Sequence, residues 1–178
     1  MKLSIFAAML LAGLAASCAP AYESSVKSSR SQGARDRYET EILNSDLAKS
    51  REYQAWVAEG RRALRDGLSI RPSFKEVIFF SPDDPTAVGY RLDLRRGQRL
   101  RVQMSRSGNT RIFAELFEQI GSADPIYRLV HSANPGKSEF SFEAHSDGIH
   151  VLRLQPEIMK GAEVAITLST AAGLTFPV

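Results

Sequence analysis

Eight short segments in which apolar and polar residues alternate make up most of the chain after Pro72. Turn formers such as Arg95-Arg96-Gly97 and Ser146-Asp147-Gly148 stand between them. The segments are 75–80, 89–94, 99–105, 111–117, 126–131, 138–143, 149–154 and 163–169. This period of two predicts short β-strands that bury one face and expose the other to water. Because no helical pattern intervenes, the fold class expected over 72–178 is mostly β, an antiparallel β-sandwich of about eight strands with Greek-key connections.

Residues 35–67 show a helical spacing instead. The positions expected to face inward are Ile42, Trp56, Val57 and Leu64. Asn44 and Ser45 interrupt the pattern and could cap a second segment, and Gly67 is placed to end it. The segment is therefore one long broken helix or two shorter helices. We expect Trp56 to pack against the following domain rather than to stack on a ligand.

Cys18 is the only cysteine, and it follows a short hydrophobic leader. Residues 1–17 have a basic start, an apolar stretch from Leu3 to Leu14 and the small residues Ala15, Ala16 and Ser17. The stretch is shorter than the roughly 20 apolar residues of a membrane-spanning helix. The leader resembles a bacterial lipoprotein signal peptide, with Ala15 where leucine is usual. That resemblance implies cleavage before Cys18 and lipidation of its sulfur.

Residues 18–34 are rich in serine and charge and nearly free of large apolar residues, so they are expected to form a disordered lipoprotein tether. The partner that this implies is a lipid bilayer, held through acylated Cys18. Each buried methylene contributes about 0.8 kcal/mol, and stable anchoring takes more than one acyl chain. The expected location is the periplasmic face of the cell envelope. Ala19 favours the outer membrane over the inner one.

The charge pattern argues against a nucleic-acid partner. The formal net charge is +3, and the Lys and Arg residues are interleaved with Asp and Glu rather than gathered in one stripe. An exported protein also has little access to nucleic acid. We therefore expect no nucleic-acid binding.

A search for catalytic or metal-binding patterns assigns none. His131, His145 and His150 are the only histidines, and their spacing matches no familiar zinc motif. His145 and His150 could meet across a hairpin and hold a metal with Asp147 or Glu143, but solvated histidines are the preferred interpretation. No Gly-x-Ser-x-Gly element and no phosphate-binding glycine loop occurs. The sequence therefore predicts no catalytic residue, no metal and no cofactor.

Arg153 lies between apolar residues of one expected strand. It could pack against Glu115 or Glu157, or it could point to water. We prefer water, because most arginines on exposed sheet faces need no partner.

Five segments of the sandwich region carry a family resemblance in their order. They are 87–91 (AVGYR), 96–100 (RGQRL), 113–117 (FAELF), 148–157 (GIHVLRLQPE) and 174–178 (LTFPV). In this order they resemble the region that precedes the catalytic domain in exported zinc endopeptidases of the lysostaphin and LytM type, many of which are lipoproteins. The resemblance covers about 72–178 and implies an accessory, pre-peptidase-like sandwich. The zinc-ligand motifs of the family, His-x-x-x-Asp and His-x-His, do not occur here, so no catalytic residue is carried over.

Three classes of function stay open. The first is a non-catalytic, membrane-anchored envelope lipoprotein that serves as the accessory module of a cell-wall peptidoglycan endopeptidase. The second is a stand-alone periplasmic lipoprotein that binds a glycan or a protein. An independent enzyme with an unrecognised site is the least favoured. The partners implied are peptidoglycan or a cell-wall peptidase, and no ligand-binding residue or oligomeric state can be assigned. We also expect residues 72–178 to fold without the preceding segments.

Overall fold

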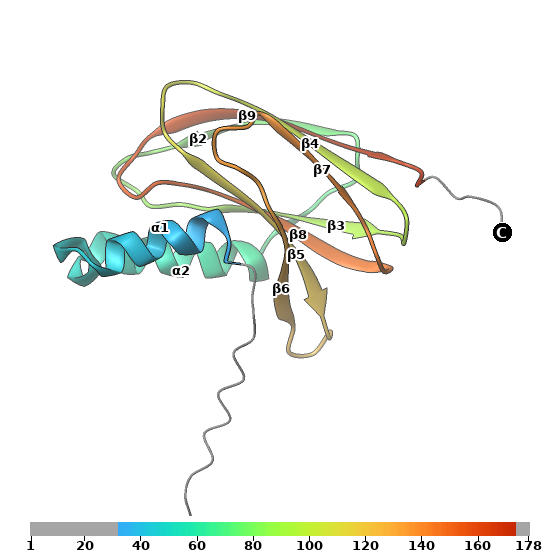
Figure 1. Cartoon of the computed structure of the whole chain (residues 1–178), viewed down its shortest axis with the longest axis horizontal. Coiled ribbons are helices and arrows are strands. Elements are labelled where there is room, and N and C mark those ends of the chain that lie inside the picture. Colours follow the sequence, from blue (N-terminus) through green and yellow to red (C-terminus); the bar gives the residue numbers. More distant parts are fainter. Residues whose placement is uncertain (1–31, 174–178) are drawn as a thin grey trace, which may run out of the picture.

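The computed structural model describes residues 32–173, and it consists of two packed β-sheets with two helices on one side (Figure 1). One sheet has the strand order β1-β3-β8-β5-β6 and the other β2-β9-β4-β7. All paired strands are antiparallel except β1 and β3, which are parallel. The mostly β sandwich expected from the sequence is confirmed. The strands are β1 (Leu68–Ser69), β2 (Phe74–Phe80), β3 (Val88–Leu94), β4 (Arg99–Arg106), β5 (Ile112–Ile120), β6 (Ile126–Ser132), β7 (Glu139–Glu143), β8 (Gly148–Pro156) and β9 (Ala162–Ala171).

All eight expected strands are present, and their ends shift by three residues at most. The turns form where glycine permits a positive φ, as at Gly97 (φ +79°) between β3 and β4. β8 ends at Pro156, which lacks the amide donor needed to continue a ladder. The sequence missed β1, because a two-residue strand has no detectable period.

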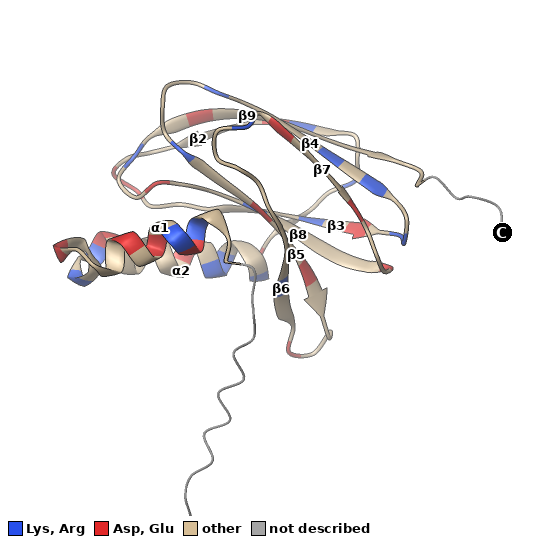
Figure 2. Ribbon diagram, viewed as in Figure 1, with Lys and Arg blue, Asp and Glu red and all other residues tan. Residues whose placement is uncertain are grey.

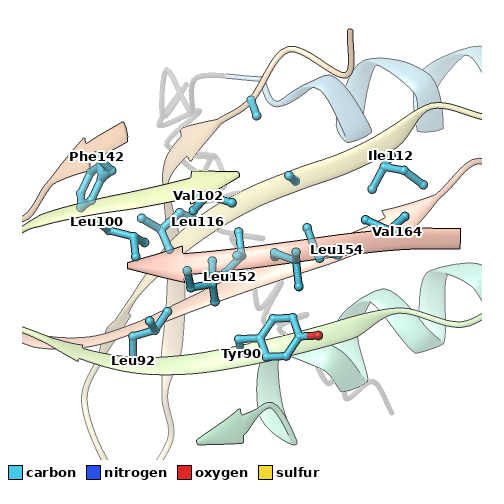
Figure 3. Packing of buried hydrophobic residues seen from close by; sticks show 14 of the residues in the cluster. Tyr90, Leu92, Leu100, Val102, Ile112, Leu116, Phe142, Leu152, Leu154 and Val164 are labelled. Carbon is cyan, nitrogen blue, oxygen red and sulfur yellow. The ribbon is translucent and has the colours of Figure 1, made fainter. Parts of the chain in front are cut away.

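The main core lies between the two sheets (Figure 3). Alternate residues of the central strands point into it, as Leu152 and Leu154 of β8 do from one sheet and Leu100 and Val102 of β4 from the other. All four side chains are fully buried. Burial of apolar surface on this scale is the main favourable contribution to folding of such a domain.

Two helices and a short 3₁₀ turn precede the strands. They are α1 (Ala34–Leu43), η1 (Asp46–Lys49) and α2 (Arg51–Arg65). α1 ends at the Asn44 cap, and the side chain of Ser50 caps α2 by accepting a hydrogen bond from the Tyr53 amide at 3.0 Å. Of the two arrangements that the sequence left open, two shorter helices is correct. No helix within residues 32–173 is long and apolar enough to cross a membrane.

The helices cover the outer face of the five-stranded sheet, where they form a second core. Its buried residues are Ala34, Ile42, Trp56, Phe113 and Ile158. Trp56 is fully buried, and its indole N–H donates to the carbonyl of Pro156 at 2.8 Å, so Trp56 packs as expected. The expectation that each strand exposes one face to water is wrong for β5 and β8, because the helices bury the outer face of these strands too.

Close approach of α2 to the sheet depends on two glycines. A Cβ at Gly89 of β3 would collide with the carbonyl oxygen of Ala63 in α2. A Cβ at Gly60 of α2 would come within 2.7 Å of the Gln155 side-chain oxygen on β8. The helix therefore rests almost directly on the backbone of the sheet.

α1 begins at Ala34, the residue at which the expected tether ends, and its amide donates to the Ser132 hydroxyl on β6 at 2.9 Å. The leader, Cys18 and all of the tether before residue 32 lie outside the described residues. The signal peptide, the lipidation and the tether therefore stay predictions.

Candidate functional site

Two adjoining hollows flank the loop 133–138 that joins β6 to β7. The first measures about 340 Å³ and is bounded by the end of β4 and by the starts of β5 and β9. The second measures about 350 Å³ and lies between the loop, β5 and α1. Both hollows are lined by Arg106, Pro135 and Gly136. We name the two hollows the loop site; its other charged and aromatic side chains are Arg37, Tyr38, Glu41, Arg111, Phe113 and Lys137.

The loop is held in place by its own turn chemistry. The Asn134 side chain accepts a hydrogen bond from the Gly136 amide at 2.9 Å, and the Asn134 carbonyl accepts one from the Lys137 amide at 2.9 Å. The Arg106 guanidinium donates to the Pro135 carbonyl. Flanking residues join the loop to the sheets through Ala133 and Ser138. A loop fixed in this way offers a preformed rather than a mobile surface.

Aromatic rings form the α1 side of the loop site. Tyr38 of α1 stacks on Phe113 of β5, with ring centroids 5.1 Å apart. The Arg111 guanidinium lies 5.0 Å from the Tyr38 ring centroid and forms an ion pair with Glu157 at 2.7 Å. Burial raises the pKa of the Tyr38 hydroxyl, and the hydrogen bond to Glu157 raises the pKa of Arg111. At neutral pH these groups are a neutral phenol and a cation.

The loop site carries cations without a carboxylate partner. None of the ion pairs between residues 32 and 173 involves Arg37, Arg106 or Lys137. Arg37 donates to the Gln32 carbonyl at 2.7 Å, and Arg106 donates to a carbonyl too. Glu41 is the one carboxylate among the lining residues of the two hollows. The site is therefore positively charged at neutral pH.

A third hollow, on the outer face of the β2-β9-β4-β7 sheet, has a different charge balance. It contains Arg99 and Arg101 of β4, and Figure 2 shows acidic residues on the neighbouring β7. Arg99 pairs with Glu143 at 3.3 Å, and Arg101 pairs with Glu139 at 2.8 Å. Each arginine is neutralised by a glutamate, so this hollow carries little net charge.

The three histidines lie in three different environments. His145 is exposed, as expected. His150 is buried on β8, where its Nδ1 lies 3.1 Å from the Gly148 carbonyl and its ring lies against Phe142, so the expectation of a solvated side chain is wrong there. The reason is that the side chain of His150 points between the sheets. His131 is half-buried and stacks on an aromatic ring of β7.

Burial lowers the pKa of both His131 and His150. Between residues 32 and 173, no group of three or more His, Cys, Asp or Glu side chains is placed to hold a metal ion. The pairing of His145 with His150 and an acidic residue that the sequence left open is therefore not formed. Cys18, the one residue to which the sequence assigned a role, lies outside the described residues.

Arg153 contradicts its expected exposure. Its guanidinium is buried between β8 and α2, where it pairs with Glu115 of β5 at 2.5 Å and donates to the Gly60 carbonyl at 3.2 Å. Of the alternatives that the sequence left open, the Glu115 partner is correct. The helices exclude water from this face of the sheet, so the charge needs a partner there.

Sequence reasoning also missed Arg35, which belongs to the same buried layer. Its Nε donates to the Gln155 side chain at 2.7 Å, and it pairs with Glu39 at 2.7 Å. Burial lowers the pKa of Arg35 to about 10. Its spacing from Glu39, one helical turn, was the only local signal. This layer joins the helices to the sheet.

The loop site was missed for a different reason. Asn134-Pro135-Gly136 has the composition of an ordinary turn, and the cations around it come from four separate stretches of the sequence. A Pro-Gly turn followed directly by Lys137 is the one local signal that could have pointed to it.

Comparisons with known proteins find distant structural likeness and no sequence match. No family model and no curated protein matches the chain. PliG of Aeromonas hydrophila, a periplasmic inhibitor of g-type lysozyme, is 11% identical over 59% of this chain and 96% of its own, with a TM-score of 0.45. The Yersinia pseudotuberculosis-derived mitogen is 10% identical over 59% and 97%, with a TM-score of 0.44. The pre-peptidase C-terminal domain of Bacillus anthracis collagenase is 11% identical over 58% and 96%, with a TM-score of 0.43.

Proposed function

We propose that this chain is a non-catalytic lipoprotein of the cell envelope, anchored through Cys18, whose sandwich binds anionic cell-wall material at the loop site. The leader pattern and the position of Cys18 support the anchor. The absence of a zinc-ligand or nucleophile motif from the sequence supports the non-catalytic role. The binding role rests on the loop site.

One observation carries the binding role: three cations line two joined hollows, and none of the ion pairs between residues 32 and 173 involves them. Glu41 is the one carboxylate in the lining, so positive charge is in excess. Lysine and arginine side chains bind carboxylates and phosphates by charge-assisted hydrogen bonds. Arg106 stands between the hollows, with Lys137 lining one and Arg37 the other. A ligand that spans both hollows would meet all three.

The rings of Tyr38 and Phe113 add an apolar surface beside these charges. Sugar rings and peptide side chains both pack on aromatic faces, and a small number of placed polar groups then fixes their orientation. Peptidoglycan combines sugar rings with peptide carboxylates. It is therefore the envelope polymer whose chemistry fits the site best.

Co-sedimentation with purified peptidoglycan tests this role. The mature chain should sediment with the polymer, and binding should weaken as salt rises, because the attraction is between charges. The double variant Arg106→Ala/Lys137→Ala should lose about tenfold or more in affinity, given that a charged hydrogen bond contributes about 1.5–3 kcal/mol.

The matched control is Arg99→Ala/Arg101→Ala, which removes two arginines that already have glutamate partners. It should bind peptidoglycan with unchanged or slightly lower affinity. Equal losses in the two double variants would show that overall charge, not the loop site, determines binding. A wild-type chain that stays in the supernatant at low salt would refute the peptidoglycan role.

The accessory role and the stand-alone role differ in the partner protein. The accessory role, which the sequence resemblance implies, requires a cell-wall endopeptidase that associates with this chain. Chemical cross-linking in the cell envelope followed by mass spectrometry should recover such a peptidase. Recovery of peptidoglycan fragments without a peptidase would favour the stand-alone role.

A further inference from the structure

The hairpin formed by β5 and β6 extends beyond the rest of its sheet. The last residue of β5 that pairs with β8 is Glu118, opposite His150. Gln119 and Ile120 pair only with β6. Figure 1 shows the tip of this hairpin projecting beyond the rest of its sheet, away from the other sheet and from the helices.

An apolar pair occupies the tip of the hairpin. Ile120 and Ile126 face each other across the two strands, and 44% and 65% of their surfaces are exposed. The connection between them, 121–125, contains one charged residue, Asp124. Single exposed apolar side chains are common on protein surfaces, but a cross-strand pair at a projecting tip presents a continuous apolar surface to the surroundings.

The described chain begins at the base of the same hairpin. A Cβ at Gly33 would lie 3.2 Å from the Leu129 side chain of β6. Leu129 is three residues from Ile126, which is about 10 Å along an extended strand. Cys18 precedes Gln32 by 14 residues in the sequence, which span at most about 50 Å. A lipid anchor at Cys18 therefore keeps the hairpin within reach of the bilayer.

We propose that the hairpin tip contacts the lipid bilayer, with Ile120 and Ile126 inserted at the boundary between headgroups and acyl chains. This inference rests on the proposed anchor at Cys18. An anchored domain meets the membrane at a high effective concentration, so a small apolar surface is enough to orient it. Behind the tip, Glu118 pairs with Arg128, which limits repulsion from anionic lipids.

The other exposed apolar side chains do not share this position. Phe79 is more exposed, at 74%, but it belongs to β2 of the opposite sheet. Figure 1 places β2 on the far side of the molecule from the hairpin. Because the described chain begins beside β6, the hairpin lies nearer than β2 to the point from which the anchor segment extends (Figure 1).

Fluorescence quenching by lipid in vesicles tests the contact. Ile126→Cys, made in the full-length chain so that Cys18 is acylated, is labelled with a polarity-sensitive dye and reconstituted in phosphatidylethanolamine and phosphatidylglycerol vesicles that contain brominated lipid. The control label is placed at Asn109→Cys, an exposed position in the turn between β4 and β5. If the tip lies at the acyl boundary, quenching at position 126 should exceed that at position 109 about twofold or more.

Ile120→Asp, combined with the label at position 126, should reduce this quenching towards the control value, because a charge at the tip opposes insertion. Phe79→Asp should leave it unchanged. Both replaced side chains are exposed, so the fold should tolerate both changes. Equal quenching at positions 126 and 109 in an acylated chain would overturn the tip contact alone. A mature chain whose Cys18 carries no acyl group by mass spectrometry would overturn the anchor, and the tip contact with it.

Discussion

Arg153 of β8 and Glu115 of β5 form an ion pair beneath α2, and both side chains are almost completely buried. The Arg153 guanidinium also donates to the Gly60 carbonyl of the helix above it, at 3.2 Å. One side chain therefore links two strands of a sheet to a helix that precedes them in the sequence. This relationship makes the helices an integral part of the domain.

The first prediction concerns this pair. Arg153→Met should lower the free energy of unfolding by about 3–5 kcal/mol, because it leaves the Glu115 carboxylate buried without a partner. The double variant Arg153→Met/Glu115→Leu should lose less than the single one, since no charge is then left unpaired. Urea unfolding followed by circular dichroism measures both. The losses of Arg153→Met and of Glu115→Leu, each measured alone, are the reference. A double variant whose loss equals their sum would show that the two side chains act independently.

The second prediction concerns the stability of residues 72–178, which the sequence predicts to fold without the preceding segments. Residues 72–178 contain every strand except β1, but without the helices they would expose Phe113 and leave Arg153 and Gln155 in contact with water. We expect this fragment to unfold at a clearly lower urea concentration than a chain that begins at residue 32. Equal midpoints for the two would mean that the second core adds nothing to stability.

The third prediction concerns the stability of the fold at acidic pH. Burial lowers the pKa of His150 below its ordinary value near 6.5, against the opposing effects of the Gly148 carbonyl, Glu118 and Asp93. The unfolded chain therefore binds a proton at higher pH than the folded one. The stability that neutral His150 contributes is present above about pH 6.5 and is lost as the pH falls from there towards the lowered pKa.

Urea midpoints at about pH 7.5 and about pH 5.5 bracket this window. The midpoint of the wild type should fall on acidification, and His150→Gln should fall less, because glutamine does not titrate. His145→Gln, which replaces an exposed histidine, is the matched control. A fall of the same size in all three proteins would assign the pH dependence to other groups.

The fourth prediction concerns the anchor. Acylated wild type should partition with membranes and into detergent, whereas Cys18→Ser should appear in the soluble fraction or remain an uncleaved precursor. Fractionation followed by immunoblotting distinguishes the two. Equal membrane partitioning of both proteins, with normal cleavage in both, would contradict the predicted lipidation of Cys18.

The sequence by itself determined the elements of this fold. The period of two in segments such as 89–94 and the glycine at position 97 depend on neighbouring residues, so a local pattern was enough to predict β3 and its turn. The cap expected at Asn44 and Ser45 precedes the 3₁₀ turn η1, whereas α2 is capped by Ser50. Tertiary structure alone decided which surfaces are buried. The alternating pattern places Arg153 and Gln155 on the solvent-exposed face of a strand. In the folded chain α1 and α2 cover that face.

The loop site also depends on tertiary structure that the sequence pattern does not reveal. Arg37, Arg106 and Lys137 belong to α1, β4 and the β6–β7 loop, and no local pattern links them. They meet because the order of strands in the two sheets brings the end of β4 beside the loop and the helices lie over β5. Charge and hydrophobicity are properties of single residues, and the sequence states them directly. The field of several charges around one hollow depends on distances that only the folded chain sets.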